Sequence, residues 1–238
     1  MRGPIMASAL GGAEEGMLAE EVNLPEDALV HVPDHLNWDE ASTLTCAGVT
    51  AWNALVEQGN LTAGDTILVM GTGGVSIFAL QFSKMMGARV IITSKSDEKL
   101  ERARSLGADE TINYHENPDW EAVVQDLTDG AGVNQVVEVG GAGTLQKSIA
   151  AAGFGAHIGL IGVLTEGQIN PNPVLRKSIH LSGIYVGSRE MFINMNAAIA
   201  ANKMKPIIDQ TFEFEDARSA YHAMGENEHF GKIVICGT

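Results

Sequence analysis

The sequence predicts an α/β fold in which helices cover both faces of a doubly wound, parallel sheet of six strands. Two observations support this fold class. Short apolar runs rich in Val and Ile alternate with helical patterns through the middle of the chain, and a glycine-rich turn joins the first run to the first helix. The composition fits a globular chain, because 45% of the 238 residues are hydrophobic and 19% are charged.

The glycine-rich turn is the most informative part of this pattern. An apolar run at 67–69 leads to Gly71, Gly73 and Gly74, and an amphipathic helical pattern follows at 75–86. Glycines at such a turn let the backbone approach a diphosphate, whose charge is stabilised by N–H groups at the helix N-terminus. We therefore predict a dinucleotide-binding (Rossmann) sheet, with an ordinary tight turn as the alternative.

The later elements follow in the order that this fold requires. We predict strands at 88–93, 107–113, 135–139, 156–161 and 179–186, and helices at 98–106, 119–127, 143–151 and 190–201.

The two chain ends have a different pattern. Residues 1–37 contain three prolines and no helical pattern, and the tail has strands at 210–214 and 232–236 around a helix at 215–224. We expect a dinucleotide-binding domain at 46–203, and a second, β-rich unit formed by residues 1–45 and 204–238.

Charge and composition narrow the function. The net charge of −15 and the pI of about 4.7 argue against nucleic acid or an anionic membrane as partner. No apolar stretch has the length of a membrane span, and the first residues lack the apolar core of a signal peptide. The two cysteines, Cys46 and Cys236, form no disulfide framework, so we expect a cytoplasmic protein.

The end of the second predicted strand indicates which dinucleotide binds. Folds that bind NAD usually place a carboxylate there for the ribose hydroxyls, whereas this chain has hydroxyls followed by Lys95 and Lys99. Asp97 and Glu98 fall in the first turn of the next helix, where they offset its dipole. Lys99 can reach a phosphate from the same helix, and Arg102 lies on the same edge. We predict NADP(H) over NAD(H); a solvated helix start is the alternative.

Several motifs together resemble the medium-chain dehydrogenase/reductase superfamily, in its zinc-type alcohol dehydrogenase-like and quinone oxidoreductase-like branches. They are a glycine-containing segment at 11–22, Leu-Pro-Glu-Asp-Ala-Leu-Val at 24–30, Cys-Ala-Gly-Val-Thr-Ala-Trp at 46–52 and Gly-Lys-Ile-Val at 231–234. The resemblance implies a GroES-like catalytic domain that the dinucleotide domain interrupts. We expect the two chain ends to be a remnant of that domain, with roughly a hundred of its residues, most of a small domain, absent upstream of Met1.

The resemblance also bears on metal binding. Cys46 matches one zinc ligand of the family, but the other ligands would belong to the absent part, and one thiolate cannot build a tetrahedral site. The seven histidines form no ligand cluster in the sequence. We expect no zinc, and we expect Cys46 to be a small buried hydrophobe.

The cofactor-binding residues, by contrast, carry over from the family pattern almost completely. Thr50 matches a threonine near the nicotinamide, Ser94, Lys99 and Tyr114 match positions around the 2′-phosphate, and Lys232 matches a tail residue near the cofactor. The other implied positions form the diphosphate turn and the strand ends of the nicotinamide half: Gly71, Thr72, Gly73, Gly74, Val75, Val139, Gly140, Gly162, Val163, Val186, Gly187 and Ser188. We assign no catalytic residue.

The resemblance implies an NADP(H)-dependent oxidoreductase that transfers hydride between nicotinamide and a small carbonyl, alcohol or enone. We expect weak activity, because most of the wall over the substrate is missing. A cofactor-binding module without turnover, structural or regulatory, is the alternative. Methyl transfer from S-adenosylmethionine is disfavoured, because it needs an acidic residue at the second strand end.

The sequence of the sixth predicted strand indicates how the chain assembles. From Ile179 to Val186 it is rich in apolar residues, and an open edge of this kind invites pairing. In the superfamily this strand pairs with its copy across a two-fold axis, so we expect a homodimer. The alternative is a buried strand that the following helix covers.

Overall fold

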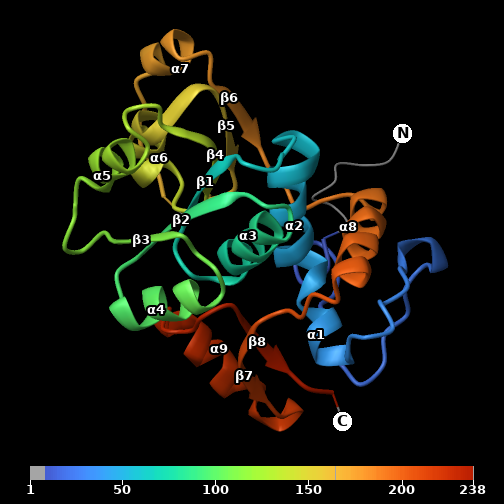
Figure 1. Cartoon of the computed structure of the whole chain (residues 1–238). Coiled ribbons are helices and arrows are strands. Elements are labelled where there is room, and N and C mark those ends of the chain that lie inside the picture. Colours follow the sequence, from blue (N-terminus) through green and yellow to red (C-terminus); the bar gives the residue numbers. More distant parts are fainter. Residues whose placement is uncertain (1–8, 164, 238) are drawn as a thin grey trace.

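The computed structural model describes residues 9–163 and 165–237, and its centre is a six-stranded parallel sheet. The strand order is β3-β2-β1-β4-β5-β6, the order of a doubly wound dinucleotide-binding sheet (Figure 1). The strands are β1 (Thr66–Met70), β2 (Arg89–Ser94), β3 (Glu110–Asn113), β4 (Val133–Glu138), β5 (Ala152–Leu160) and β6 (His180–Gly183). The predicted fold class is confirmed.

Helices pack on both faces of this sheet because successive side chains of each strand point to opposite sides. In β1, Ile67 and Val69 join a core with α3 (Gly74–Met85) and α4 (Asp97–Ser105), whereas Leu68 and Met70 join a core with α5 (Trp120–Leu127) and α6 (Ala142–Ala151). Each of the four strand residues is at most 6% exposed. The near-continuous apolar run of β1 is therefore explained by burial on both faces.

The predicted limits of β5 and β6 differ from the observed ones. β5 begins at Ala152 rather than 156, because Ala152 already pairs with Val133 of β4 ahead of a register shift. Gly153 fits there since a Cβ would lie 2.6 Å from the Ala131 carbonyl oxygen. β6 ends at Gly183 rather than 186, and the segment after it reaches a left-handed conformation at Val186, with φ of 52°. Extended pairing cannot continue through such a residue.

A helical segment connects the N-terminal part to the sheet. It runs through α1 (Trp38–Ser42), η3 (Leu44–Gly48), α2 (Val49–Trp52) and η4 (Asn53–Gln58). Asn37 caps its start, because the Asn37 side chain accepts from the Glu40 N–H at 2.8 Å and the Glu40 carboxylate accepts from the Asn37 N–H. A shorter helix, α7 (Asn172–Arg176), precedes β6, and α8 (Arg189–Asn202) follows it.

The C-terminal tail has the predicted strand, helix and strand. β7 (Ile208–Phe212) pairs in parallel with β8 (Lys232–Ile235), and α9 (Ala217–Glu226) connects them. These elements lie together at the bottom of Figure 1, beside α4. The GroES-like origin of the two chain ends stays a prediction, and residues 1–8 of the N-terminal part lie outside the described range. Within the described range, no helix is long and apolar enough to cross a membrane.

Candidate functional site

The candidate site lies at the carboxyl ends of β1 and β4, where the strand order reverses. The chain leaves β1 through α3 toward one face and leaves β4 through α6 toward the other, which makes this position the topological switch point of the sheet. Open α/β sheets bind their ligands at this kind of switch point.

The glycine-rich turn is open on the side where a diphosphate would lie. A Cβ at Gly71 or Gly73 would meet no atom within 4 Å, and Gly71 has a φ of 71°. The turn ends at the N-terminus of α3, a helix of 12 residues. The residues present therefore fit a diphosphate, which would approach the turn closely and bind helix N–H groups.

Two neighbours hold this turn in place. The Ser76 hydroxyl donates to the Met70 carbonyl at 2.6 Å, so this serine points into the protein and leaves the mouth of the turn clear. The C-terminal tail crosses behind the turn, with the Gly231 N–H donating to the Thr72 carbonyl at 2.9 Å. A Cβ at Gly74 would lie 2.7 Å from Cδ of Lys232, so the predicted residue Lys232 packs directly against the turn.

The predicted 2′-phosphate residues come together in a pocket next to the turn. The pocket has a volume of about 270 Å³ and is lined by Ser94, Lys95, Lys99, Tyr114, Asn227 and His229 together with Gly71, Thr72 and Gly73. Lys99 is only 8% exposed, and its Nζ donates to the Asn227 carbonyl at 3.1 Å. Lys95 pairs with Glu228 at 3.3 Å. Both lysines therefore border the pocket while anchored to the loop after α9.

The nearby acidic residue points elsewhere. An Asp97 carboxylate oxygen accepts a hydrogen bond from the Asn113 amide at 2.8 Å, and Asp97 lines a different pocket with Glu116 and Arg104. Arg102, marked in the sequence as a candidate phosphate cation, instead pairs with Asp209 at 2.7 Å and lies over the Phe230 ring.

His229 is a pocket residue that the sequence did not single out. Burial lowers the pKa of its imidazole, and the positive charges of Lys99 and Lys232 act in the same direction, whereas Asp209 opposes them. Its position two residues before Gly231, in the tail motif, was the only signal in the sequence that could have found it.

The end of β4 supplies the second half of the site. Predicted residues Val139 and Gly140 follow Glu138, and Gly162 at the end of β5 packs against them so closely that a Cβ on Gly162 would lie 2.4 Å from the Gly141 nitrogen. The Glu138 carbonyl accepts from the N–H groups of Ile161 and Gly162 at 2.9 and 3.0 Å. These contacts bring Val139, Gly140 and Gly162 together. Val163, the next predicted residue, is 86% exposed and does not pack with them.

Glu138 itself was missed by the sequence analysis. Its side chain is fully buried, and its Oε1 accepts from the Gly140 N–H at 2.8 Å and the Gly141 N–H at 3.0 Å. A buried acidic residue inside an apolar strand was the signal that could have drawn attention to it, because a buried charge usually has dedicated partners.

The remaining predicted residues lie where α2 meets the segment after β6. Thr50 is 4% exposed on α2, and the Asn53 amide donates to the Val186 carbonyl at 2.8 Å. A Cβ at Gly187 would lie 2.5 Å from Cγ2 of Val49, so this glycine permits the close approach. Ser188 caps α8 by accepting from the Met191 N–H at 3.2 Å.

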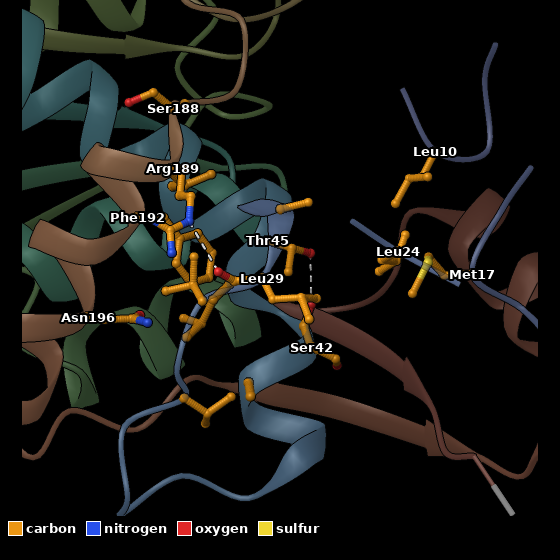
Figure 2. Close-up of a pocket in the computed structure, with 17 residues that line it drawn as sticks. Leu10, Met17, Leu24, Leu29, Ser42, Thr45, Ser188, Arg189, Phe192 and Asn196 are labelled. Atoms are coloured by element: carbon orange, nitrogen blue, oxygen red, sulfur yellow. Dashed lines mark hydrogen bonds between the residues drawn. The ribbon is translucent and has the colours of Figure 1, made fainter. Parts of the chain in front are cut away.

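An apolar cavity adjoins this last group. It has a volume of about 560 Å³ and shares Val49, Gly187 and Ser188 with the site. Figure 2 shows Phe192 and Leu29 on one side, with Leu10, Met17 and Leu24 on the other. Two polar side chains of its lining bond to the N-terminal segment: Arg189 Nε donates to the Leu29 carbonyl at 3.1 Å, and the Asn196 amide donates to the His31 carbonyl at 2.9 Å.

Cys46 corrects one of our predictions. The sequence indicated a small buried hydrophobe, but Cys46 is exposed on η3, because Leu44, Ala47 and Gly48 form the buried side of this helix and Cys46 lies with Thr45 on the exposed side. Among residues 9–163 and 165–237, no three His, Cys, Asp or Glu side chains come together as a metal site would require. The described residues therefore do not by themselves fit a catalytic zinc.

Comparison with known proteins agrees with this architecture. Residues 74–201, more than half of the chain, match the family model described as zinc-binding dehydrogenase. A zinc-type alcohol dehydrogenase-like protein of Schizosaccharomyces pombe is 42% identical over 236 residues, which cover 96% of this chain and 68% of the relative.

Solved structures show the same likeness. A candidate alcohol dehydrogenase of Sinorhizobium meliloti 1021 superposes with a TM-score of 0.92 at 44% identity, covering 96% of this chain and 67% of that one. An NAD-dependent alcohol dehydrogenase superposes with a TM-score of 0.88 at 34% identity, again covering 96% and 67%. The chain therefore belongs to the zinc-binding dehydrogenase family, whose similar members are alcohol dehydrogenase-like oxidoreductases.

Proposed function

We propose that this chain binds NADP(H) and transfers hydride between its nicotinamide and a small carbonyl, alcohol or enone. The observation that carries the cofactor choice is the pocket at the end of β2, where Ser94, Lys95, Lys99 and Tyr114 adjoin the glycine turn and Asp97 points away. Lysines and hydroxyls suit a 2′-phosphate, whereas a carboxylate in this place would repel it.

The chain's own residues have mainly binding and orienting roles in this proposal. The turn at Gly71–Gly74 holds the diphosphate, Lys95 and Lys99 neutralise the 2′-phosphate, and Val139, Gly140 and Val186 border the nicotinamide half. When bound, the cofactor supplies or accepts the hydride, and the protein keeps donor and acceptor in register. We propose that the apolar body of the substrate enters the cavity of Figure 2 beside Gly187 and Ser188.

Turnover by purified protein tests this proposal. We expect NADPH to be oxidised slowly with aldehyde, ketone or enone substrates, followed by its absorbance, and NADPH to bind about tenfold more tightly than NADH in calorimetry. Equal affinities would overturn the cofactor choice, and tighter binding of NADH would favour NAD(H), the cofactor named for one structural neighbour. Tight binding without turnover would favour the rival function of a structural or regulatory module.

Three other parts of the proposal are tested separately. We propose that the chain works without a zinc of its own, so elemental analysis after dialysis should find well under one zinc per chain. We also propose that the chain lies in the cytoplasm, which microscopy of a tagged protein can check, and that it forms a homodimer.

The dimer would pair β6 with its copy. β6 is the edge of the sheet, and Leu181 is 38% exposed there. Placing Asp at this position should split the dimer, because two carboxylates would face each other across the two-fold axis. Light scattering after size exclusion should then give a monomer of 25.2 kDa, whereas Ser182→Asn, a neutral polar change on the same strand, should leave the dimer intact. A wild-type monomer would end the proposal.

A further inference from the structure

The carboxylate of Glu138 is the most deeply buried charged group beside the candidate site. Glu138 is the last residue of β4, and its side chain has no exposed surface. Oε1 accepts from the N–H groups of Gly140 and Gly141 at 2.8 and 3.0 Å and from the Thr144 hydroxyl at 2.7 Å, and Oε2 accepts from the Ser148 hydroxyl.

This environment stabilises a negative charge. Three donors converge on one oxygen, and two of them are backbone N–H groups just before α6. The N-terminus of α6 adds the positive end of a helix dipole. The donors replace the water that a carboxylate loses on burial, and hydrogen bonds of this kind are strong when the acceptor oxygen is charged.

The same hydrogen bonds fix the shape of the turn at residues 139–141. The Gly140 carbonyl accepts from the Thr165 hydroxyl at 2.8 Å, and the Gly141 carbonyl accepts from the Thr144 and Leu145 N–H groups at 3.1 and 3.0 Å. Gly162 closes the other side, since no Cβ would fit between it and the Gly141 nitrogen. Every N–H and C=O of Gly140 and Gly141 is therefore engaged, and the turn has no freedom to relax.

We infer that Glu138 is a positioning residue that holds the turn beside which the nicotinamide of a bound cofactor would lie, and that its buried charge would favour the oxidised cofactor over the reduced one. The inference rests on the proposed function only in that a nicotinamide cofactor binds, and it holds for either NADP(H) or NAD(H). The nicotinamide ring gains a positive charge when it gives up hydride, so a fixed carboxylate near the bound ring would stabilise the oxidised form more.

A purely structural role makes a different prediction. If Glu138 only shaped the turn, removing its charge would weaken the binding of the oxidised and of the reduced cofactor by the same factor. If the role is electrostatic, removing the charge instead changes the ratio of the two dissociation constants. A change in this ratio corresponds to a shift in the reduction potential of the bound cofactor.

The test measures four dissociation constants, for NADP⁺, NADPH, NAD⁺ and NADH, by calorimetry on wild type, Glu138→Gln and Ser148→Ala. Gln keeps the size and the acceptor oxygen of Glu138 but not its charge. We expect this variant to raise the dissociation constant of each oxidised cofactor by about threefold or more relative to that of its reduced partner. A change of this size is expected from the loss of one charge that acts over a short distance through the protein interior. Ser148→Ala removes a hydrogen bond and keeps the charge, so it should change both forms equally.

The outcomes separate the inference from the proposed function. An unchanged ratio in folded Glu138→Gln overturns the inference, even if the wild type prefers NADPH as proposed. A changed ratio supports it, even if the wild type prefers NADH. A wild type that binds none of the four cofactors overturns both.

A second variant covers the case in which Glu138→Gln does not fold. The combined change Glu138→Gln and Ser148→Ala removes the charge and the hydroxyl that would face the new amide group, while the amide oxygen can still accept from the Gly140 and Gly141 N–H groups. The same shift in ratio is expected, and an unchanged ratio again contradicts the inference.

Discussion

The two halves of the candidate site are held together in opposite ways. Around the pocket at the end of β2, the lysines form hydrogen bonds and ion pairs with the loop after α9, and Lys95 and Glu228 are half exposed or more. At the ends of β4 and β5, by contrast, a buried carboxylate and close-packed glycines hold the turn. Exposed ion pairs contribute little to stability and can exchange partners, whereas a buried, fully bonded network cannot.

This difference indicates a division of roles. The pocket at β2 can release Lys95 to a phosphate at small cost, so it suits a part of the site that selects between cofactors. The turn at β4 is held by buried hydrogen bonds and close-packed glycines, so it suits the part that orients a reacting ring. The predictions below test this contrast.

The largest effect is expected from Gly162→Ala. The new Cβ would lie 2.4 Å from the Gly141 nitrogen and 2.5 Å from the Val139 carbonyl oxygen, both backbone atoms of the rigid turn. We expect the free energy of unfolding to fall by about 3 kcal/mol, as overpacking of this severity does. Urea denaturation measures it, and Gly225→Ala is the matched control because a Cβ there meets nothing within 4 Å. Equal stability of both variants would mean that the turn at β4 is flexible.

The second prediction separates binding from stability at the glycine turn. Gly73 has a φ of −76° and open space where a Cβ would point, so Gly73→Ala should leave the unfolding free energy nearly unchanged. The methyl group would instead occupy the approach of the diphosphate. We expect cofactor affinity to fall about tenfold or more, equally for NADPH and NADH. Unchanged affinity would show that the diphosphate does not bind over this turn.

The sequence predicted the fold and most of the candidate site because those features depend on local pattern. The apolar runs of β1 and β2 and the glycines after β1 each have a direct structural requirement. Glu138 could not be predicted in the same way, since its donors Thr144 and Ser148 come from the next helix and only packing brings them together. Arg102 was misleading for the same reason, because its partner Asp209 is far away in the chain.

The third prediction concerns selectivity at the pocket by β2. Lys99→Met keeps the buried stem of the side chain and removes its charge. We expect NADPH to bind about tenfold more weakly while NADH changes by less than about twofold, because only NADPH carries the 2′-phosphate. Arg104→Ala on the same helix is the control, since Arg104 forms an ion pair with Glu101 at the surface and does not line the pocket by β2. An equal loss for both cofactors would make Lys99 a structural residue tied to Asn227.

The smallest effect is expected far from both halves, at His157 in β5. This side chain is 6% exposed, neither ring nitrogen has a hydrogen-bond partner among the described residues, and it pairs in register with His180 of β6. Burial lowers the pKa of His157, and the neighbouring His180 lowers it further.

This shift makes stability depend on pH. The pKa of His157 in the folded protein lies below its value in the unfolded chain, which is about 6.5, so the unfolded chain binds more protons in this range. Stability from this group is fully present above pH 6.5 and is lost as the pH falls toward the folded pKa. His157→Leu should remove that loss, by no more than about 1.4 kcal/mol per pH unit, the limit for one proton. Urea denaturation at pH 7.5 and pH 5.5 measures the difference, with the exposed His222→Gln as the control. If the wild type and His157→Leu lose the same stability between these pH values, His157 is protonated in the folded protein and the edge of the sheet is more open than β5 and β6 indicate.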